Sequence, residues 1–317
     1  MSRVEEIVAE QLAKQPTEVI PNGHRYWLAS GITELTFRPV ASGTGSSDVS
    51  HIATVETHFV DEDMPDYSGA ELARLNRRSV FGSFYRADDG VRSKATYSIR
   101  KDEPNPQWVA FVLLIAFVQQ QRLGLGIGQA NLSDELSRAN RASLNYPRNW
   151  TRSVPEDAFK AFADDLWRAG YASTTQPDGL LVNINLSDDG SSRPGTQRSE
   201  TALLHITTDI RHPLAGAGYL GTIELPIDPP QQHIVEWSGY LNEQEHMQED
   251  FPPRLGAWGL RGFANKLVYA LFIPADEGDA MVVWALTNWL IMRTLWIKRA
   301  FWQAGSGLHR PGAEGNG

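Results

Sequence analysis

Four histidines give the sequence its first candidate for chemistry. His51 and His58 are seven residues apart in one predicted strand, and His205 and His212 repeat this spacing in another. Imidazole is the commonest metal ligand in proteins. Successive strand residues point to opposite faces, so two residues at an odd separation cannot hold one ion together. We therefore predict no metal site; a site that takes one histidine from each strand is the alternative.

An acidic run offers a second candidate. Glu243, Glu245, Glu249 and Asp250 follow one another closely, with His246 among them. Paired carboxylates can act as general acid and base. So dense a run on a predicted surface is more typical of a solvated face, and we expect these side chains to be solvated.

No other motif indicates catalysis. Residues 124–128 read Gly-Leu-Gly-Ile-Gly, but they follow a predicted helix instead of a strand, and no Gly-Lys-Ser/Thr comes after them. We interpret them as the end of that helix. The chain has no Gly-x-Ser-x-Gly elbow and no cysteine, which excludes thiolate chemistry, disulfides and cysteine-held zinc. The sequence thus predicts no catalytic residue, no cofactor and no enzyme.

Charge and hydropathy limit the classes of partner and the cellular location that we expect. The 317 residues include 29 basic and 38 acidic side chains, and a net charge of −9 argues against nucleic acid as a partner. The apolar stretches 108–118 and 280–292 are shorter than the roughly 20 residues of a membrane span. The polar N-terminal stretch does not resemble a signal peptide. We expect a cytoplasmic protein without a membrane span.

The two halves of the chain repeat one another. The octapeptides at 51–58 and 205–212 share four of eight positions, and Leu-Asn at 75–76 recurs at 241–242. Phe-Gly-Ser-Phe at 81–84 resembles Leu-Gly-Ala-Trp at 255–258, and a further match joins 94–97 to 266–269. The matches keep the same order in both halves. The sequence predicts two tandem copies of one module.

The periodicity of apolar residues predicts the helices and strands of each module. The order is helix, strands, helix, two strands, helix, with antiparallel strands and helices on one face of the sheet, which defines an α+β fold. Strands are expected at 25–30, 34–39 and 50–59, with counterparts at 180–186 and 202–210 and an added strand at 219–225. The closing helices are expected at 106–122 and 276–302.

The first module also resembles a known family. The residues at 71–84, Glu-Leu-Ala-Arg-Leu-Asn-Arg-Arg-Ser-Val-Phe-Gly-Ser-Phe, with Asp-Asp-Gly at 88–90 and a strand after them, are similar to the YbjN-like relatives of type III secretion chaperones of the CesT type. The resemblance covers 52–121. It is weaker in the second half, where 242–253 change the spacing between helix and hairpin. It implies a peptide-binding chaperone whose modules pair, here as a covalent pseudo-dimer or as a homodimer.

Aromatic residues supply the predicted contacts with a partner. Ten Trp in an acidic chain exceed the needs of a core of this size, and Trp and Tyr are frequent binding hot spots. An exposed sheet edge can accept an extended peptide through main-chain hydrogen bonds, and an acidic surface favours a basic client. Core packing is the alternative for each ring. The candidates on strands and hairpins are Trp27, Phe84, Tyr85, Tyr97, Trp258 and Tyr269.

These observations predict a non-catalytic chaperone or adaptor that holds a partner polypeptide at a sheet edge or in the cleft between modules. A small-molecule sensor or enzyme with a site between the modules is one alternative, and a structural subunit of a larger assembly is another. The predicted organisation is a first module at 1–130, a linker with a short helix at 131–154, a second module at 155–304 and a disordered tail at 305–317.

Overall fold

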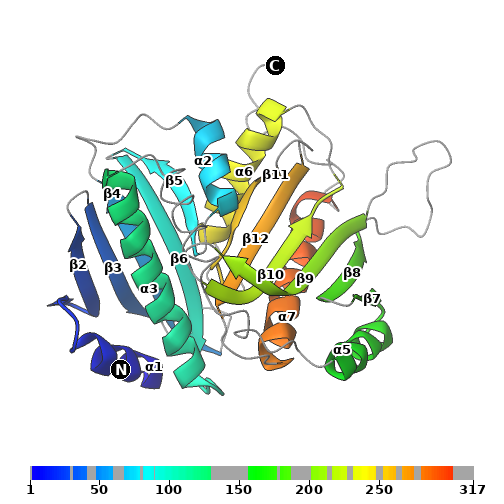
Figure 1. The fold of residues 1–317 in the computed structure, drawn as a ribbon, viewed down its shortest axis with the longest axis horizontal. Coiled ribbons are helices and arrows are strands. Elements are labelled where there is room, and N and C mark those ends of the chain that lie inside the picture. Colours follow the sequence, from blue (N-terminus) through cyan, green and yellow to red (C-terminus); the bar gives the residue numbers. More distant parts are fainter. Residues whose placement is uncertain are drawn as a thin grey trace.

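The computed structural model contains two six-stranded antiparallel sheets with their helices, placed next to each other (Figure 1). The fold is therefore α+β, built from two sheet-and-helix modules, as the sequence predicts. The predicted linker 131–154 and tail 305–317 lie outside the described residues. The structure describes residues 2–28, 31–40, 48–59, 68–78, 81–88, 90–129, 156–176, 179–186, 201–212, 216–226, 231–247, 253–261, 266–274 and 280–302.

The first module begins and ends with a helix. Its strands follow the order β1-β2-β3-β4-β6-β5 across the sheet, with every neighbouring pair antiparallel. Helices α1 and α3 pack together and cover one face of this sheet (Figure 1). The elements are α1 (Arg3–Leu12), β1 (Glu18–Ile20), β2 (Gly23–Leu28), β3 (Gly31–Pro39), β4 (Val49–Phe59), α2 (Gly69–Arg78), β5 (Ser83–Ala87), β6 (Gly90–Arg100) and α3 (Pro106–Gln129).

The second module repeats this plan. Its strands follow the order β7-β8-β9-β10-β12-β11, which is the order of the first sheet strand for strand. Helix α7 packs on β9 and β10, and α5 packs on β7 and β8. The elements are α5 (Glu156–Arg168), β7 (Ala172–Gln176), β8 (Gly179–Asn185), β9 (Thr201–His212), β10 (Gly216–Glu224), α6 (Gln231–Met247), β11 (Ala257–Arg261), β12 (Lys266–Pro274), α7 (Ala280–Ile297) and the π-helical turn η3 (Lys298–Trp302).

The shared strand order corrects two details of the predicted repeat. The strand predicted at 219–225 as an addition is β10, the counterpart of β4, while the short edge strands β1 and β7 were not predicted. The octapeptides 51–58 and 205–212 lie in β4 and β9, which occupy different places in their sheets. Strands in which apolar and polar residues alternate have similar sequences at any position in a sheet. The match between the octapeptides therefore did not identify structurally equivalent strands.

Local sequence signals explain how the helices begin and which face they bury. Ser2 and Glu5 form a capping box at the start of α1, whose Val4, Val8 and Leu12 side chains are buried. Helix α3 continues through residues 124–128 to Gln129, so the predicted stop at these glycines is wrong. Among the described residues, no helix is long and apolar enough to span a membrane.

The two modules meet through main chain as well as side chains. The Gly82 N–H donates to the Leu255 carbonyl at 2.6 Å, and Thr96 and Arg254 exchange a pair of backbone hydrogen bonds at 3.1 and 2.8 Å. In addition, the Trp289 ring of α7 packs against Tyr97 of β6. The segment that leads into β11 thus extends the inner edge of the first sheet.

Candidate functional site

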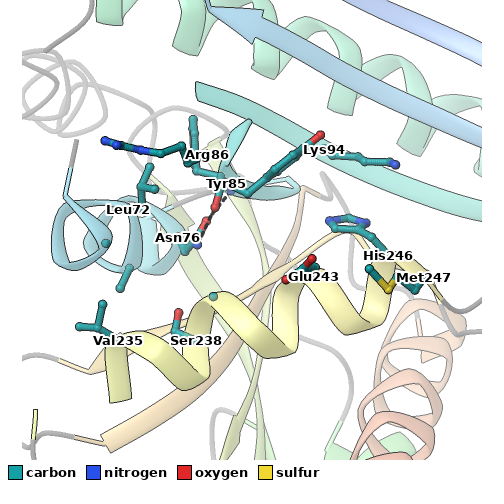
Figure 2. Close-up of a pocket in the computed structure, with 14 residues that line it drawn as sticks. Leu72, Asn76, Tyr85, Arg86, Lys94, Val235, Ser238, Glu243, His246 and Met247 are labelled. Carbon is teal, nitrogen blue, oxygen red and sulfur yellow. Dashed lines mark hydrogen bonds between the residues drawn. The ribbon is translucent and has the colours of Figure 1, made fainter. Parts of the chain in front are cut away.

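A cleft of about 530 Å³ lies where the modules meet. Helix α2 and strands β5 and β6 of the first module form one side, and α6 of the second module forms the other (Figure 2). Its lining is mainly apolar. The residues around it are Gly69, Leu72, Ala73, Asn76, Phe84, Tyr85, Arg86, Lys94, Val235, Ser238, Gly239, Glu243, His246 and Met247.

The side chain of one asparagine in each module fixes the wall helices to the edge strands. Asn76 of α2 donates to the Phe84 carbonyl at 3.1 Å and accepts from the Phe84 N–H at 2.5 Å. Asn242 of α6 makes the same two bonds with Trp258 of β11, at 3.0 and 2.8 Å. Each amide satisfies the outward main-chain groups of an edge-strand residue that would otherwise be buried without partners.

Small residues keep the two wall helices close without filling the cleft. A Cβ atom on Gly69 of α2 would lie 3.1 Å from Cγ1 of Val235 in α6, so the helices touch at this point. Gly239, one turn further along α6, is exposed, and a Cβ atom there would meet nothing within 4 Å. The space beside Gly239 is therefore open.

A buried ion pair links α6 to α7. Glu245 accepts from the Nε of Arg293 at 2.7 Å and from the indole N–H of Trp258 at 2.7 Å. The Arg293 guanidinium also donates to the Pro253 carbonyl and lies 4.0 Å from the centre of the Tyr269 ring. Glu245, predicted to be solvated, is thus a core residue; Glu243 is exposed, and Glu249 and Asp250 lie outside the described residues.

The lining residue His246 is bonded to a buried serine behind the cleft, Ser83. Ser83 Oγ and His246 Nε2 are joined by a hydrogen bond of 2.7 Å across the module boundary. His246, predicted to be solvated, is half-buried, and its Nδ1 is buried without a hydrogen-bond partner in the described part of the chain.

The electrostatic surroundings of this pair differ from those of a catalytic dyad. A general base needs a pKa near the working pH and a third group that orients it. Burial, with a contribution from the charges of Lys94 and other cations, lowers the pKa of His246 to about 3. The imidazole is therefore a weak base at neutral pH, and the bond to Ser83 serves to join the modules.

The predicted partner-binding residues divide between cleft, surface and core. Trp27 is 60% exposed on β2, away from the cleft, and its indole N–H donates to Glu18 at 2.9 Å. Tyr85 is half-buried on the cleft wall, and its hydroxyl donates to Glu56 at 2.5 Å. The remaining rings, Phe84, Tyr97, Trp258 and Tyr269, are buried at 6% exposure or less, and Phe84 also borders the cleft.

Burial also affects the acidity of these tyrosines. It raises the pKa of Tyr85, Tyr97 and Tyr269 well above the ordinary value, and for Tyr85 the hydrogen bond to Glu56 acts in the same direction. All three hydroxyls stay protonated at neutral pH and remain hydrogen-bond donors.

Histidines and carboxylates do not gather into a metal site in the described part of the chain, where no group of three or more is close enough to hold an ion. His58 lies 3.7 Å from Glu56, and His51 bonds to the neighbouring Ser50. The α6 side of the cleft, with Ser238, Gly239 and Met247, was not predicted. The available signal was the Leu-Asn repeat, which placed α6 as the equivalent of α2.

Comparison with known proteins gave no match to a family model, to a curated protein or to a solved structure. The resemblance of residues 71–90 to YbjN-like chaperones therefore stays a prediction. The functional argument rests on the cleft itself.

Proposed function

We propose that this protein is a non-catalytic binding protein, a chaperone or adaptor, that holds a short segment of a partner polypeptide in the cleft between its two modules. The observation that carries this proposal is the cleft, whose apolar walls come from α2 of one module and α6 of the other. A ligand there contacts both modules at once. Sites of about 300–1,000 Å³ with mainly apolar walls and a few polar groups are typical of ligand binding.

The inner sheet edges are less suited to accept a peptide. Asn76 and Asn242 already bond the outward groups of Phe84 and Trp258, and the segment at Arg254 pairs with Thr96 of β6. Strand addition at these edges would require breaking those bonds. We therefore favour the cleft over the inner sheet edges.

Filling the cleft tests the proposal. Gly239→Trp puts a large ring into the open space beside α6, and Lys160→Trp on the exposed surface of α5 is the matched control. We expect a fluorescein-labelled peptide pool rich in Leu and Met to bind the wild type and the control equally, and Gly239→Trp at least ten-fold more weakly. Equal anisotropy curves for all three proteins would disprove binding in the cleft.

A small molecule is the second candidate occupant, because the volume also suits one. A thermal-shift screen with metabolites and nucleotides separates the two. A rise of several degrees with one compound, absent in Gly239→Trp, would favour a sensor or enzyme over a polypeptide-binding protein.

A further inference from the structure

Lys94 gives the cleft a specific chemical character. It stands on β6, where it pairs with Ser83 of β5, and its half-buried side chain lines the cleft close to His246 (Figure 2). Its ammonium makes no ion pair with any residue that the structure describes. A cation beside apolar walls, where solvent is reduced, interacts more strongly with an anion than it would on the open surface.

The carboxylate that stands opposite Lys94 in the sheet is already engaged. Glu56 of β4 stands opposite Lys94, but it accepts the hydroxyl of Tyr85 at 2.5 Å and lies 3.6 Å from Arg92 and 3.7 Å from His58. Glu56 therefore interacts with Tyr85, Arg92 and His58. The Lys94 ammonium is thus available to another anion.

Among the lining residues that the structure describes, basic side chains outnumber carboxylates. Arg86 and Lys94 come from the first module, and Glu243 is the one carboxylate among the described lining residues. His246 contributes no charge at neutral pH. This small excess of basic side chains among the described lining residues is opposite in sign to the chain as a whole, whose net charge is −9. The net charge predicts a basic client, but it averages over surfaces that a ligand in the cleft does not touch.

We infer that the cleft recognises an acidic segment, in which a carboxylate next to apolar side chains bonds to Lys94 while the apolar side chains fill the space between α2 and α6. The inference rests on the proposed function and names the class of polypeptide that it takes. The hydrogen bonds of an ammonium to a carboxylate are stronger than those between neutral groups. The amide of an asparagine in the same place would gain much less.

Three peptides and three variants test this inference. The probes are fluorescein-labelled heptapeptides of sequence Ser-Gly-Leu-Asp-Leu-Gly-Ser and its twins with Asn or Lys in place of Asp. We expect the Asp peptide to bind the wild type about ten-fold more tightly than the Asn twin, with the Lys twin weakest. Lys94→Gln should reduce the preference for Asp over Asn to less than two-fold, Lys94→Arg should retain it, and Lys14→Gln in the exposed turn after α1 should leave it unchanged.

The outcomes separate the inference from the proposed function. Equal binding of all three peptides, lost in Gly239→Trp, would overturn the inference and leave the proposed function standing. A preference for the Lys twin, or a preference for Asp that survives Lys94→Gln, would also overturn the inference. If the peptides and the Leu- and Met-rich pool all fail to bind, the proposed function fails, and the inference fails with it.

Discussion

The side-chain amide of Asn76 holds both main-chain groups of Phe84, donating to its carbonyl and accepting from its N–H. The amide lies beside an edge strand and takes the place that the next strand of a sheet would occupy. Because Asn242 does the same for Trp258, the relationship is a property of the module. It fixes the angle between each wall helix and its hairpin, and so shapes the cleft.

Removing either amide should destabilise the fold. Asn76→Ala and Asn242→Ala each leave a buried N–H and a buried carbonyl without partners, at about 1–3 kcal/mol for each group. We expect the free energy of unfolding in urea to fall by roughly 2–4 kcal/mol for each variant. Circular dichroism at increasing urea concentration measures this.

The control is Asn288→Ala in α7. Within the described part of the chain, Asn288 donates only to the carbonyl of Trp284 in its own helix. Its loss should change stability by no more than about 0.5 kcal/mol. A similar small effect for Asn76→Ala or Asn242→Ala would contradict the role of these amides.

The sequence predicted this part of the fold because the signals are local. Leu-Asn in the helix and the aromatic residue in the hairpin recur in both halves, at 76 and 84 and at 242 and 258. The structure confirms that these positions are equivalent. The capping box of Ser68 and Glu71 likewise marks the start of α2, with the Ser68 backbone N–H donating to Glu71 at 2.8 Å.

Features that depend on tertiary contacts could not be predicted in this way. Trp258 and Tyr269 pack against each other in the core and Trp27 is exposed, although all three are strand aromatics. Sequence alternation identifies the faces of a strand without saying which of them another element will cover. The cleft arises from the approach of α2 and α6, which no local pattern records.

The buried pair Glu245–Arg293 should show strong coupling. Glu245→Gln or Arg293→Met leaves one charge buried without its counter-ion, and we expect each to lower the free energy of unfolding by about 3–5 kcal/mol. The double variant buries no charge and should lose less than the sum of the two. A double-mutant cycle measured by urea unfolding tests this. Additive effects would contradict the coupling.

Stability should depend on pH through His246. Its pKa is lowered to about 3 in the folded chain, against an ordinary value near 6.5 in the unfolded chain. Between these values the unfolded state binds about one proton more than the folded state, so stability falls as the pH drops from 6.5 towards 3. The slope is about 1.4 kcal/mol per pH unit for each such proton.

Urea unfolding between pH 4.5 and 7 measures this slope. His246→Gln keeps a polar side chain near Ser83 and removes the titrating group, so its slope should be smaller by about one proton. Burial also lowers the pKa of His24, which leaves part of the dependence in place. An unchanged slope in His246→Gln would show that His246 is protonated equally in both states.

Replacing either of two glycines with alanine should change the stability of the fold, in opposite directions. In Gly239→Ala the new methyl group meets nothing within 4 Å, and it removes a flexible residue from the interior of α6. We expect thermal unfolding to show a gain of about 0.5–1 kcal/mol. Gly256→Ala would place its methyl group 2.2 Å from the carbonyl oxygen of Ala270, so this variant should lose stability. Destabilisation by Gly239→Ala would mean that the space beside α6 is occupied in solution, which would contradict an open cleft.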